Sequence, residues 1–266
     1  MPKTIKNKYY ECLTFKNLYD AHMRARKNKR SKNQVIVYER NLEYNLTLLL
    51  DKLKRGEYKV GNYKKFIIYE PKEREIQSLP YEDRIVQQWY VYEFVLPYIL
   101  PKFINQTYAC IKDRGTHKAV QKVQEYIRRA SIIYPDCYIL KCDIKKFFMS
   151  INPDILYDIM KRHITDKYIL RLTKQLIYND EIDLGIPIGN YTSQYFANIY
   201  LDVLDKFVKN VLKCKFYTRY MDDFILILEN KAMAKDYKKK IEEFIDVNLK
   251  LELNHKSRYY PIRQRC

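Results

Sequence analysis

The sequence is poor in glycine and lacks the patterns of zinc fingers, disulfide scaffolds and membrane segments. Only 5 of its 266 residues are glycine, and its 6 cysteines and 4 histidines include no Cys-x-x-Cys pair and no zinc-ligand spacing. These cysteines indicate reduced thiols in a cytoplasmic protein. No apolar signal core opens the chain and no uncharged run is long enough to span a bilayer, so we expect no membrane association.

Positive charge, in contrast, is abundant. Lysine and arginine number 50 against 32 acidic residues, which gives a net charge of +18. Such a balance favours a polyanionic partner such as nucleic acid. The same abundance of Lys, Asn, Ile and Tyr would also follow from an A/T-rich genome, so composition alone leaves nucleic-acid binding open. The length allows one large domain or two lobes.

Helical and strand-like patterns alternate along the chain, which predicts a mixed α/β or α+β fold. Leucines at helical spacing end at Arg55-Gly56, a helix stop, and Thr116 is a good helix N-cap. Helices are predicted over 42–55, 83–98, 117–127, 196–207 and 231–247, and strands over 63–69, 74–79, 137–144, 216–220, 224–228 and 250–253.

Two adjacent acids, Asp222 and Asp223, separate two β-prone apolar runs and are predicted at the turn of a hairpin. Adjacent carboxylates repel each other unless they are solvated or bind a cation such as Mg²⁺. The dipeptide by itself is more typical of a solvated turn. Asp143, at the end of another predicted strand, favours the metal site, because two-metal nucleotidyl transfer needs carboxylates from separate elements.

With these motifs the chain resembles reverse transcriptases of the bacterial group that includes group II intron and retron enzymes, most closely those of diversity-generating retroelements. Leu140–Phe148 resembles the first catalytic motif and Tyr220–Asp223 the Tyr-x-Asp-Asp motif. The resemblance implies that Asp143, Asp222 and Asp223 are catalytic and hold two Mg²⁺ ions, with Mn²⁺ as an alternative ion. It extends over nearly the whole chain in the family's motif order.

The resemblance also assigns substrate contacts. Phe148 takes the place of an aromatic gate against the ribose 2′-hydroxyl, which implies deoxynucleotide preference; a core aromatic is the alternative. In the fingers motif, Arg74 is favoured for binding the incoming triphosphate and Lys72 is second, since arginine grips phosphate bidentately. Lys256 takes the place of a catalytic lysine near the leaving pyrophosphate, and a solvated surface lysine is an equally good interpretation.

A loop with an aliphatic residue before glycine, Ile188-Gly189, followed by Ser193-Gln194, resembles the diversity-generating enzymes, whereas most relatives have Gln and Ser-Pro there. The resemblance implies low fidelity, notably opposite template adenine. Ile188 and Gly189 are expected at the nucleotide, and a glycine in so glycine-poor a chain indicates close backbone approach. The residues expected at the nucleic acid are Arg114, Ser193, Gln194 and Tyr220.

The implied fold is an α+β right-hand polymerase with fingers and an antiparallel palm sheet. The expected division is a helical extension at 1–54, fingers at 55–135, a palm at 136–260 with a helical insertion around 153–180, and a tail at 261–266 without a thumb. The implied partners are an RNA template, a DNA or RNA primer, dNTPs and a small basic accessory protein.

Three other functions compete with this one. An inactive or thumbless polymerase could serve as a nucleic-acid-binding scaffold, and an RNA-templated RNA polymerase or a defence-type reverse transcriptase working without template would share the palm. The three acids and Phe148 favour activity, whereas the missing thumb favours the scaffold.

Overall fold

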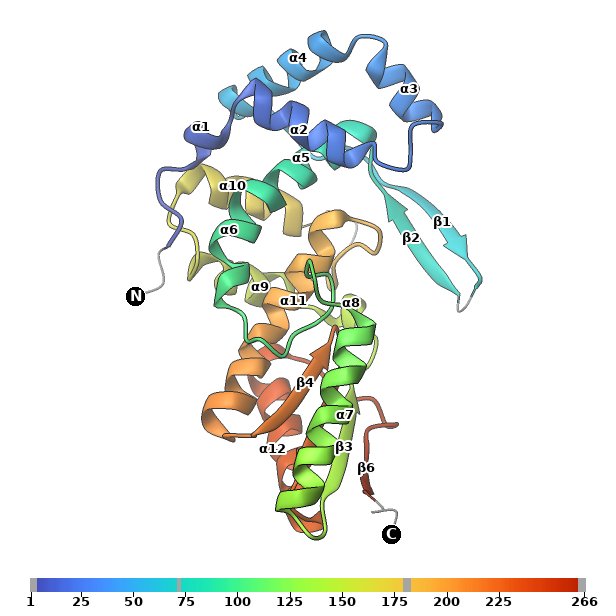
Figure 1. Ribbon diagram of the computed structural model, residues 1–266. Helices are drawn as coiled ribbons and strands as arrows, with labels where there is room; N and C mark the ends of the chain where they lie inside the picture. The colour runs from blue at the N-terminus through green and yellow to red at the C-terminus, as the bar shows by residue number, and fades with distance from the viewer. Residues whose placement is uncertain (1–3, 71–72, 179–182, 263–266) are drawn as a thin grey trace. The chain divides into compact units, whose positions relative to one another are not determined.

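The computed structural model describes residues 4–70, 73–178 and 183–262 (Figure 1). The chain divides into two compact units. Unit 1 comprises Met1–Lys102 and Pro153–Phe196, and unit 2 comprises Phe103–Asn152 and Ala197–Cys266. Among the described residues, no helix combines the length and the apolar character needed to cross a bilayer.

Unit 1 is mainly helical. Its helices are α1 (Tyr9–Cys12), α2 (Phe15–Ala25), α3 (Asn33–Glu39), α4 (Leu42–Arg55), α5 (Tyr81–Tyr90), α6 (Leu96–Tyr98), α9 (Pro153–Lys161) and α10 (Lys167–Ile177). A π-helical segment, Val91–Val95, joins α5 to α6, and a 3₁₀ turn, Leu100–Lys102, follows. The predicted helix 83–98 is therefore three consecutive helical segments.

The core of unit 1 follows from apolar side chains at helical spacing. In α4, Leu46, Leu49 and Leu53 recur every three or four residues and are buried. Gly56, at φ 70°, ends this helix in the left-handed conformation that glycine adopts at little cost. Trp89 of α5 is fully buried and donates its indole N–H to the Cys12 carbonyl at 2.9 Å. The predicted helix 42–55 is confirmed.

A two-stranded antiparallel ribbon projects from the helices of unit 1 (Figure 1). Strand β1 (Lys64–Ile68) pairs with β2 (Arg74–Ser78), and every β1 residue is exposed. Towards its base the ribbon is anchored through Gln77, which is buried and donates its backbone N–H to the Ile188 carbonyl at 2.9 Å. The predicted hairpin is confirmed.

Unit 2 is built on a four-stranded antiparallel sheet in the order β4-β5-β3-β6. Its strands are β3 (Tyr138–Asp143), β4 (Phe216–Tyr220), β5 (Asp223–Leu228) and β6 (Arg258–Pro261). Its helices are α7 (Thr116–Ile133), α8 (Phe147–Ser150) and α12 (Lys231–Leu249), together with most of α11 (Tyr191–Lys206) and a π-helical segment, Phe207–Val211. The α+β class predicted from the sequence is confirmed.

Alternation along the strands gives this sheet two different faces. On one face, Phe216 and Ile227 form an apolar cluster with Tyr126 of α7. On the other face, Tyr217 bonds Asp205 of α11. The helix α7 thus packs on one face of the sheet through apolar side chains, and α11 contacts the other face through buried polar side chains.

Two local predictions were wrong. The helix α7 begins at Thr116 itself, after Gly115 at φ 141°, so Thr116 is not the N-cap and makes no capping bond. The predicted strand 250–253 does not form, because Lys250 adopts a left-handed conformation that ends α12 and leaves Leu253 only an isolated bridge to Ile144. On the edge of β3 that faces away from β5, the pairing strand is β6.

Candidate active site

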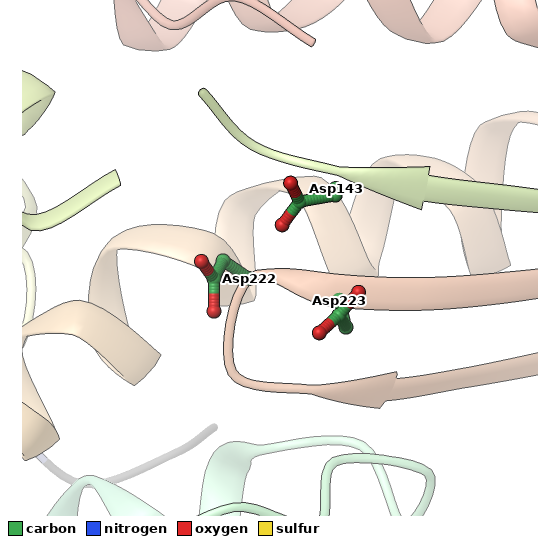
Figure 2. Close-up of side chains that lie close together, drawn as sticks. All are labelled: Asp143, Asp222 and Asp223. Carbon is green, nitrogen blue, oxygen red and sulfur yellow. The ribbon is translucent and has the colours of Figure 1, made fainter. Parts of the chain in front are cut away.

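Three carboxylates meet at one end of the unit 2 sheet. Asp143 ends β3, Asp222 lies in the turn between β4 and β5, and Asp223 begins β5 (Figure 2). One oxygen of each lies within 4.8 Å of the others. The structure thereby brings together the three acids that were predicted from separate segments of the sequence.

Strand register explains this proximity. In the antiparallel pair of β3 and β5, Asp143 stands directly opposite Asp223, so the two side chains share one face of the sheet. The β4–β5 connection contains only Met221 and Asp222, and Met221 has φ 55°. Tight hairpin turns require such positive φ values, which cost a residue with a branched or bulky side chain more than glycine.

A loop from the C-terminal part of unit 2 holds Asp143 in place. Asn254 donates from Nδ2 to Asp143 Oδ2 at 2.8 Å and from its backbone N–H to the Asp143 carbonyl at 2.7 Å. Ser257 is buried and accepts the Asp143 backbone N–H at 3.1 Å. Bonds of this kind orient a carboxylate that binds a metal. Asn254 and Ser257 were not among the predicted site residues.

Arg219, the residue directly before Tyr220, also supports the turn that carries Asp222. Arg219 is fully buried and donates from Nη1 to the Met221 carbonyl at 2.9 Å. Sequence reasoning missed it, although one signal was present: alternation along Phe216–Tyr220 places a positive charge on the same strand face as Tyr217. A cation there requires a buried anionic partner.

The oxygen set fits a hard divalent cation. Carboxylates are the ligands that Mg²⁺ and Mn²⁺ prefer, and each of Asp143, Asp222 and Asp223 offers at least one oxygen. The neighbouring thiol does not compete for the cation, because burial raises the pKa of Cys142 to about 12 and keeps it neutral. Mg²⁺ binding itself remains a prediction.

The other predicted residues of unit 2 have distinct surroundings. Phe148 is half-buried in α8 and contacts the fully buried Phe147 edge-on, so Phe147 rather than Phe148 is the core aromatic. Lys256 is exposed in the loop that bonds Asp143. Tyr220 is 39% exposed and lines, with Asp223 and the first turns of α7, a pocket of about 420 Å³.

Arg114 has a visible structural role. Its Nη1 donates to the carbonyls of Ile104 and Thr107, at 3.2 and 2.7 Å. The half-buried guanidinium thus stabilises the segment that precedes α7. A contact with nucleic acid would have to use its other donors, and that contact remains a prediction.

One of the two predicted triphosphate contacts, Arg74, belongs to the ribbon of unit 1. Arg74 begins β2, opposite Ile68, and is exposed. Within the part of the chain that the structure describes, no hydrogen bond or ion pair engages its guanidinium. Lys72 lies outside the described residues.

The predicted loop residues Ile188 and Gly189 lie against β2 of the same unit. Gly189 has φ 124°, and a Cβ there would lie 2.6 Å from the Gln77 carbonyl oxygen, so the close backbone approach predicted from the sequence is confirmed. Only glycine fits without moving the ribbon. Ser193 is buried, whereas Gln194 is exposed.

Gly189 and Gln194 line a polar pocket of about 340 Å³ within unit 1. Lys29 and Arg84 lie on its wall and contribute positive charge. One buried donor on this wall, Gln87 Nε2, has no hydrogen-bond partner among the described residues. Cations and an unsatisfied donor make this wall suited to a polar, anionic ligand.

Comparison with known proteins identifies relatives of the chain. Residues 64–260 match the family described as reverse transcriptase (RNA-dependent DNA polymerase). The putative COX1/OXI3 intron 2 protein of Saccharomyces cerevisiae is 30% identical over 95 residues, which are 32% of this chain and 11% of that protein. The putative intron 1 protein of the same yeast is 24% identical over 184 residues, covering 65% and 21%.

Similar solved structures are telomerases. That of Candida albicans, in complex with a fragment of telomeric RNA, aligns with a TM-score of 0.56 at 12% identity over 79% of this chain and 44% of its own. That of Candida tropicalis, truncated from the C-terminal domain, aligns with a TM-score of 0.54 at 16% identity over 81% and 54%. At this identity the likeness concerns the fold alone. The chain spans about a tenth to a fifth of the curated relatives and about half of these structures.

Proposed function

The chain belongs to the reverse transcriptase (RNA-dependent DNA polymerase) family, and we propose that it synthesises DNA on an RNA template by two-metal nucleotidyl transfer. The observation that carries this proposal is the cluster of Asp143, Asp222 and Asp223, whose oxygens lie within 4.8 Å of one another. In this proposal the sheet of unit 2 belongs to the palm, the ribbon of unit 1 belongs to the fingers, and residues 1–54 form the N-terminal extension.

Each proposed role matches the setting of its residue. Asp143, Asp222 and Asp223 hold the divalent ions, which when bound supply positive charge to the attacking 3′-hydroxyl and to the triphosphate. Arg74, exposed at the start of β2, donates to the triphosphate oxygens. Lys256, exposed in the loop that bonds Asp143, serves the leaving pyrophosphate.

The half-buried ring of Phe148 is assigned to sugar selection. Its neighbour Phe147 already fills the apolar core, so the Phe148 ring is free to contact a ligand on its exposed side. A bulky ring beside the sugar would clash with a 2′-hydroxyl and favour dNTPs over NTPs.

Primer extension tests the proposal. The protein is given an RNA template, an annealed DNA primer, Mg²⁺ and either dNTPs or NTPs. We expect template-dependent extension with dNTPs, abolished by Asp222→Asn and retained in Asp236→Asn, a matched exchange of an acid on the surface of α12.

Other outcomes separate the competing functions. Extension with NTPs on RNA would identify an RNA polymerase, and synthesis without any template a defence-type enzyme. Template binding without synthesis, equal in the wild-type protein and the Asp222→Asn variant, would identify a scaffold. Undiminished synthesis by the Asp222→Asn variant would contradict the metal assignment.

We further propose that the enzyme is error-prone opposite template adenine, as in diversity-generating retroelements. Supporting this proposal, Ile188 offers only an apolar side chain beside Gly189, and its backbone carbonyl accepts a bond from Gln77 of β2. An apolar side chain cannot hydrogen-bond the templating pair, which would loosen its selection.

Error rates measured base by base on a defined RNA test this second proposal. Adenine positions should be miscopied more often than the others, and Ile188→Gln should lower that excess. Equal error rates at all four bases would contradict it, while leaving RNA-directed synthesis untouched.

The proposed partners are an RNA template, a primer and a small basic accessory protein. The basic wall of the unit 1 pocket, with Lys29 and Arg84, supports binding of a nucleic-acid backbone. A cytoplasmic location is supported by Cys12, Cys110, Cys137, Cys142 and Cys214, which are all free thiols.

A further inference from the structure

A buried arginine in β4 has every one of its donors satisfied. Arg219 is 0% exposed, and its Nε and Nη2 bind the two oxygens of Asp205 at 2.7 and 2.6 Å. Its Nη1 donates to Asn198 Oδ1 and to the Met221 carbonyl, both at 2.9 Å, and Nη2 also donates to the Asn198 carbonyl at 3.4 Å. All five N–H groups of the guanidinium are thus used.

Its partner Asp205 is equally complete. This carboxylate is 0% exposed and accepts two further hydrogen bonds, from Tyr217 at 2.6 Å and from Thr107 at 2.8 Å. Four bonds fill the lone-pair positions of its two oxygens. A buried ion pair with full bonding has one arrangement open to it, because any shift leaves a charge unpaired.

The backbone of Arg219 is fixed as well. Its N–H donates to the Gln106 carbonyl at 2.9 Å, and its carbonyl accepts from the Tyr108 N–H at 3.0 Å. The guanidinium therefore projects from a strand that is held along its outer edge, towards a helix that holds Asp205 and Asn198. Asp205 and Asn198, which bind the guanidinium, belong to the helix α11. Its remaining described partner is the carbonyl of Met221, which lies in the turn between β4 and β5.

That carbonyl belongs to the peptide that joins Met221 to Asp222. Met221 has φ 55°, a conformation that non-glycine residues adopt only when their surroundings impose it. Holding the Met221 oxygen fixes the plane of this peptide, and with it the direction in which the next two residues leave the turn.

We propose that Arg219, gripped by Asp205 and Asn198, is a positioning residue that sets the Met221–Asp222 peptide and so aims the carboxylates of Asp222 and Asp223 at the divalent ions. The proposal rests on the metal site of the proposed function. Arg219 touches no substrate, and its action passes through the turn alone. The competing role is that of a core ion pair that stabilises unit 2 without affecting the site.

Metal binding without nucleic acid separates the two roles. The probe is Mn²⁺, titrated into the protein and followed by its electron paramagnetic resonance signal, with urea unfolding measured in parallel. Arg219→Lys keeps the charge beside Asp205 but loses the fork that reaches Met221. We expect its Mn²⁺ dissociation constant to rise about tenfold, the scale on which a residue that orients a metal ligand acts.

Lys206→Met is the matched control. It breaks the pair of Lys206 with the buried Asp202 on the same helix, without touching the turn. It should lower the urea midpoint and leave Mn²⁺ affinity within about twofold, the spread expected for a distant site. Should Arg219→Lys fail to fold, Asn198→Ala removes one partner of the same Nη1 and should weaken Mn²⁺ binding in the same direction.

A compensating change makes the test decisive. Asparagine tolerates positive φ better than methionine, so Met221→Asn should restore most of the affinity lost in the Arg219→Lys variant. A core ion pair predicts no such rescue. Lower stability with unchanged Mn²⁺ affinity, or a double variant as weak as the single one, would overturn the proposal. Unchanged Mn²⁺ binding in Asp143→Asn and Asp222→Asn would instead overturn the metal site itself.

Discussion

The acids of unit 2 and Arg74 on the ribbon of unit 1 are held very differently. Asp143 is bonded by Asn254 and Ser257, and the turn that carries Asp222 is bonded by Arg219. Arg74 of unit 1 stands exposed on a two-stranded ribbon, and the structure describes no bond to its guanidinium. The carboxylate site of unit 2 is therefore pre-organised, whereas the donors of Arg74 remain available to a ligand.

This difference has a physical reason. Ions bound at fixed distances need ligands that cost little entropy to arrange, so their carboxylates are held by neighbouring bonds. A group that grips an incoming triphosphate must admit and release it, and a pre-formed partner would compete with the ligand. We therefore expect changes in unit 2 to act on ion binding and catalytic rate, and changes in the ribbon to act on nucleotide affinity.

The largest effect is expected from Asp143→Asn. The exchange removes one negative charge but keeps the shape and an oxygen that can accept from Asn254 Nδ2. Extension should therefore fall by at least about a thousandfold, the scale of losing a group that stabilises transition-state charge, with little loss of stability. Single-nucleotide extension rates and thermal unfolding measure both. A rate within tenfold of the wild-type value would remove Asp143 from the metal site.

A second test measures how much the buried and incompletely bonded Asp202 lowers the stability of the folded protein. Asp202, on the same helix as Asp205, is buried, and its Oδ1 has no partner among the described residues. Burial raises the pKa of Asp202 from 3.8 to about 6, although the bond from Lys206 opposes this rise. The folded state thus binds a proton that the unfolded state releases.

The sign of the pH dependence follows directly. The stability that Asp202 contributes when protonated is fully present below about pH 4 and is lost as the pH rises through 6. Asp202→Asn abolishes this loss, so its stability relative to wild type should improve by ~2 kcal/mol between pH 4 and 7. Urea unfolding at both pH values measures it, with Asp236→Asn as the exposed control. A difference that is independent of pH would show that Asp202 remains ionised.

The sequence predicted this site because its signals are local. Asp143 lies at the end of one predicted strand, and the Asp222-Asp223 pair lies between two β-prone apolar runs. The helix at 42–55, the ribbon and the close approach at Gly189 are likewise encoded within short windows, by leucine spacing, by β-prone runs around a turn and by a scarce glycine.

The residues that hold the site could not be found in this way. Asn254 and Ser257 lie more than a hundred positions from Asp143, and Asp205 lies 14 positions before Arg219 on a different element. Such pairs depend on tertiary packing. The same loop explains the wrong strand at 250–253, because Asn254 bonds Asp143 and displaces the pairing strand to Arg258–Pro261.

A third test removes the hydrogen bond that Asn254 donates to the Asp143 carboxylate. Asn254→Ala leaves all three acids in place but frees the Asp143 carboxylate to rotate. The Mg²⁺ concentration for half-maximal extension should rise about tenfold or more, as for other residues that orient a metal ligand. His255→Ala, an exposed exchange in the same loop, should leave it unchanged. An unaltered Mg²⁺ requirement in the Asn254→Ala variant would mean that Asp143 needs no such support.

The smallest effect is expected from Arg74→Ala on the ribbon, since the structure describes no bond to the Arg74 guanidinium. Because Arg74 supports nothing in the folded chain that the structure describes, its loss should leave unfolding and Mg²⁺ dependence unchanged. The KM for dNTPs should rise about tenfold, as expected for the loss of one charge-assisted bond, with kcat nearly constant. Lys64→Ala, at the base of the same ribbon opposite Ser78, should raise the KM much less. If Arg74→Ala instead lowered kcat with KM unchanged, Arg74 would bind only the transition state. The Arg74 side chain would then have to be held in one position during each turnover, as the carboxylate of Asp143 is held by Asn254.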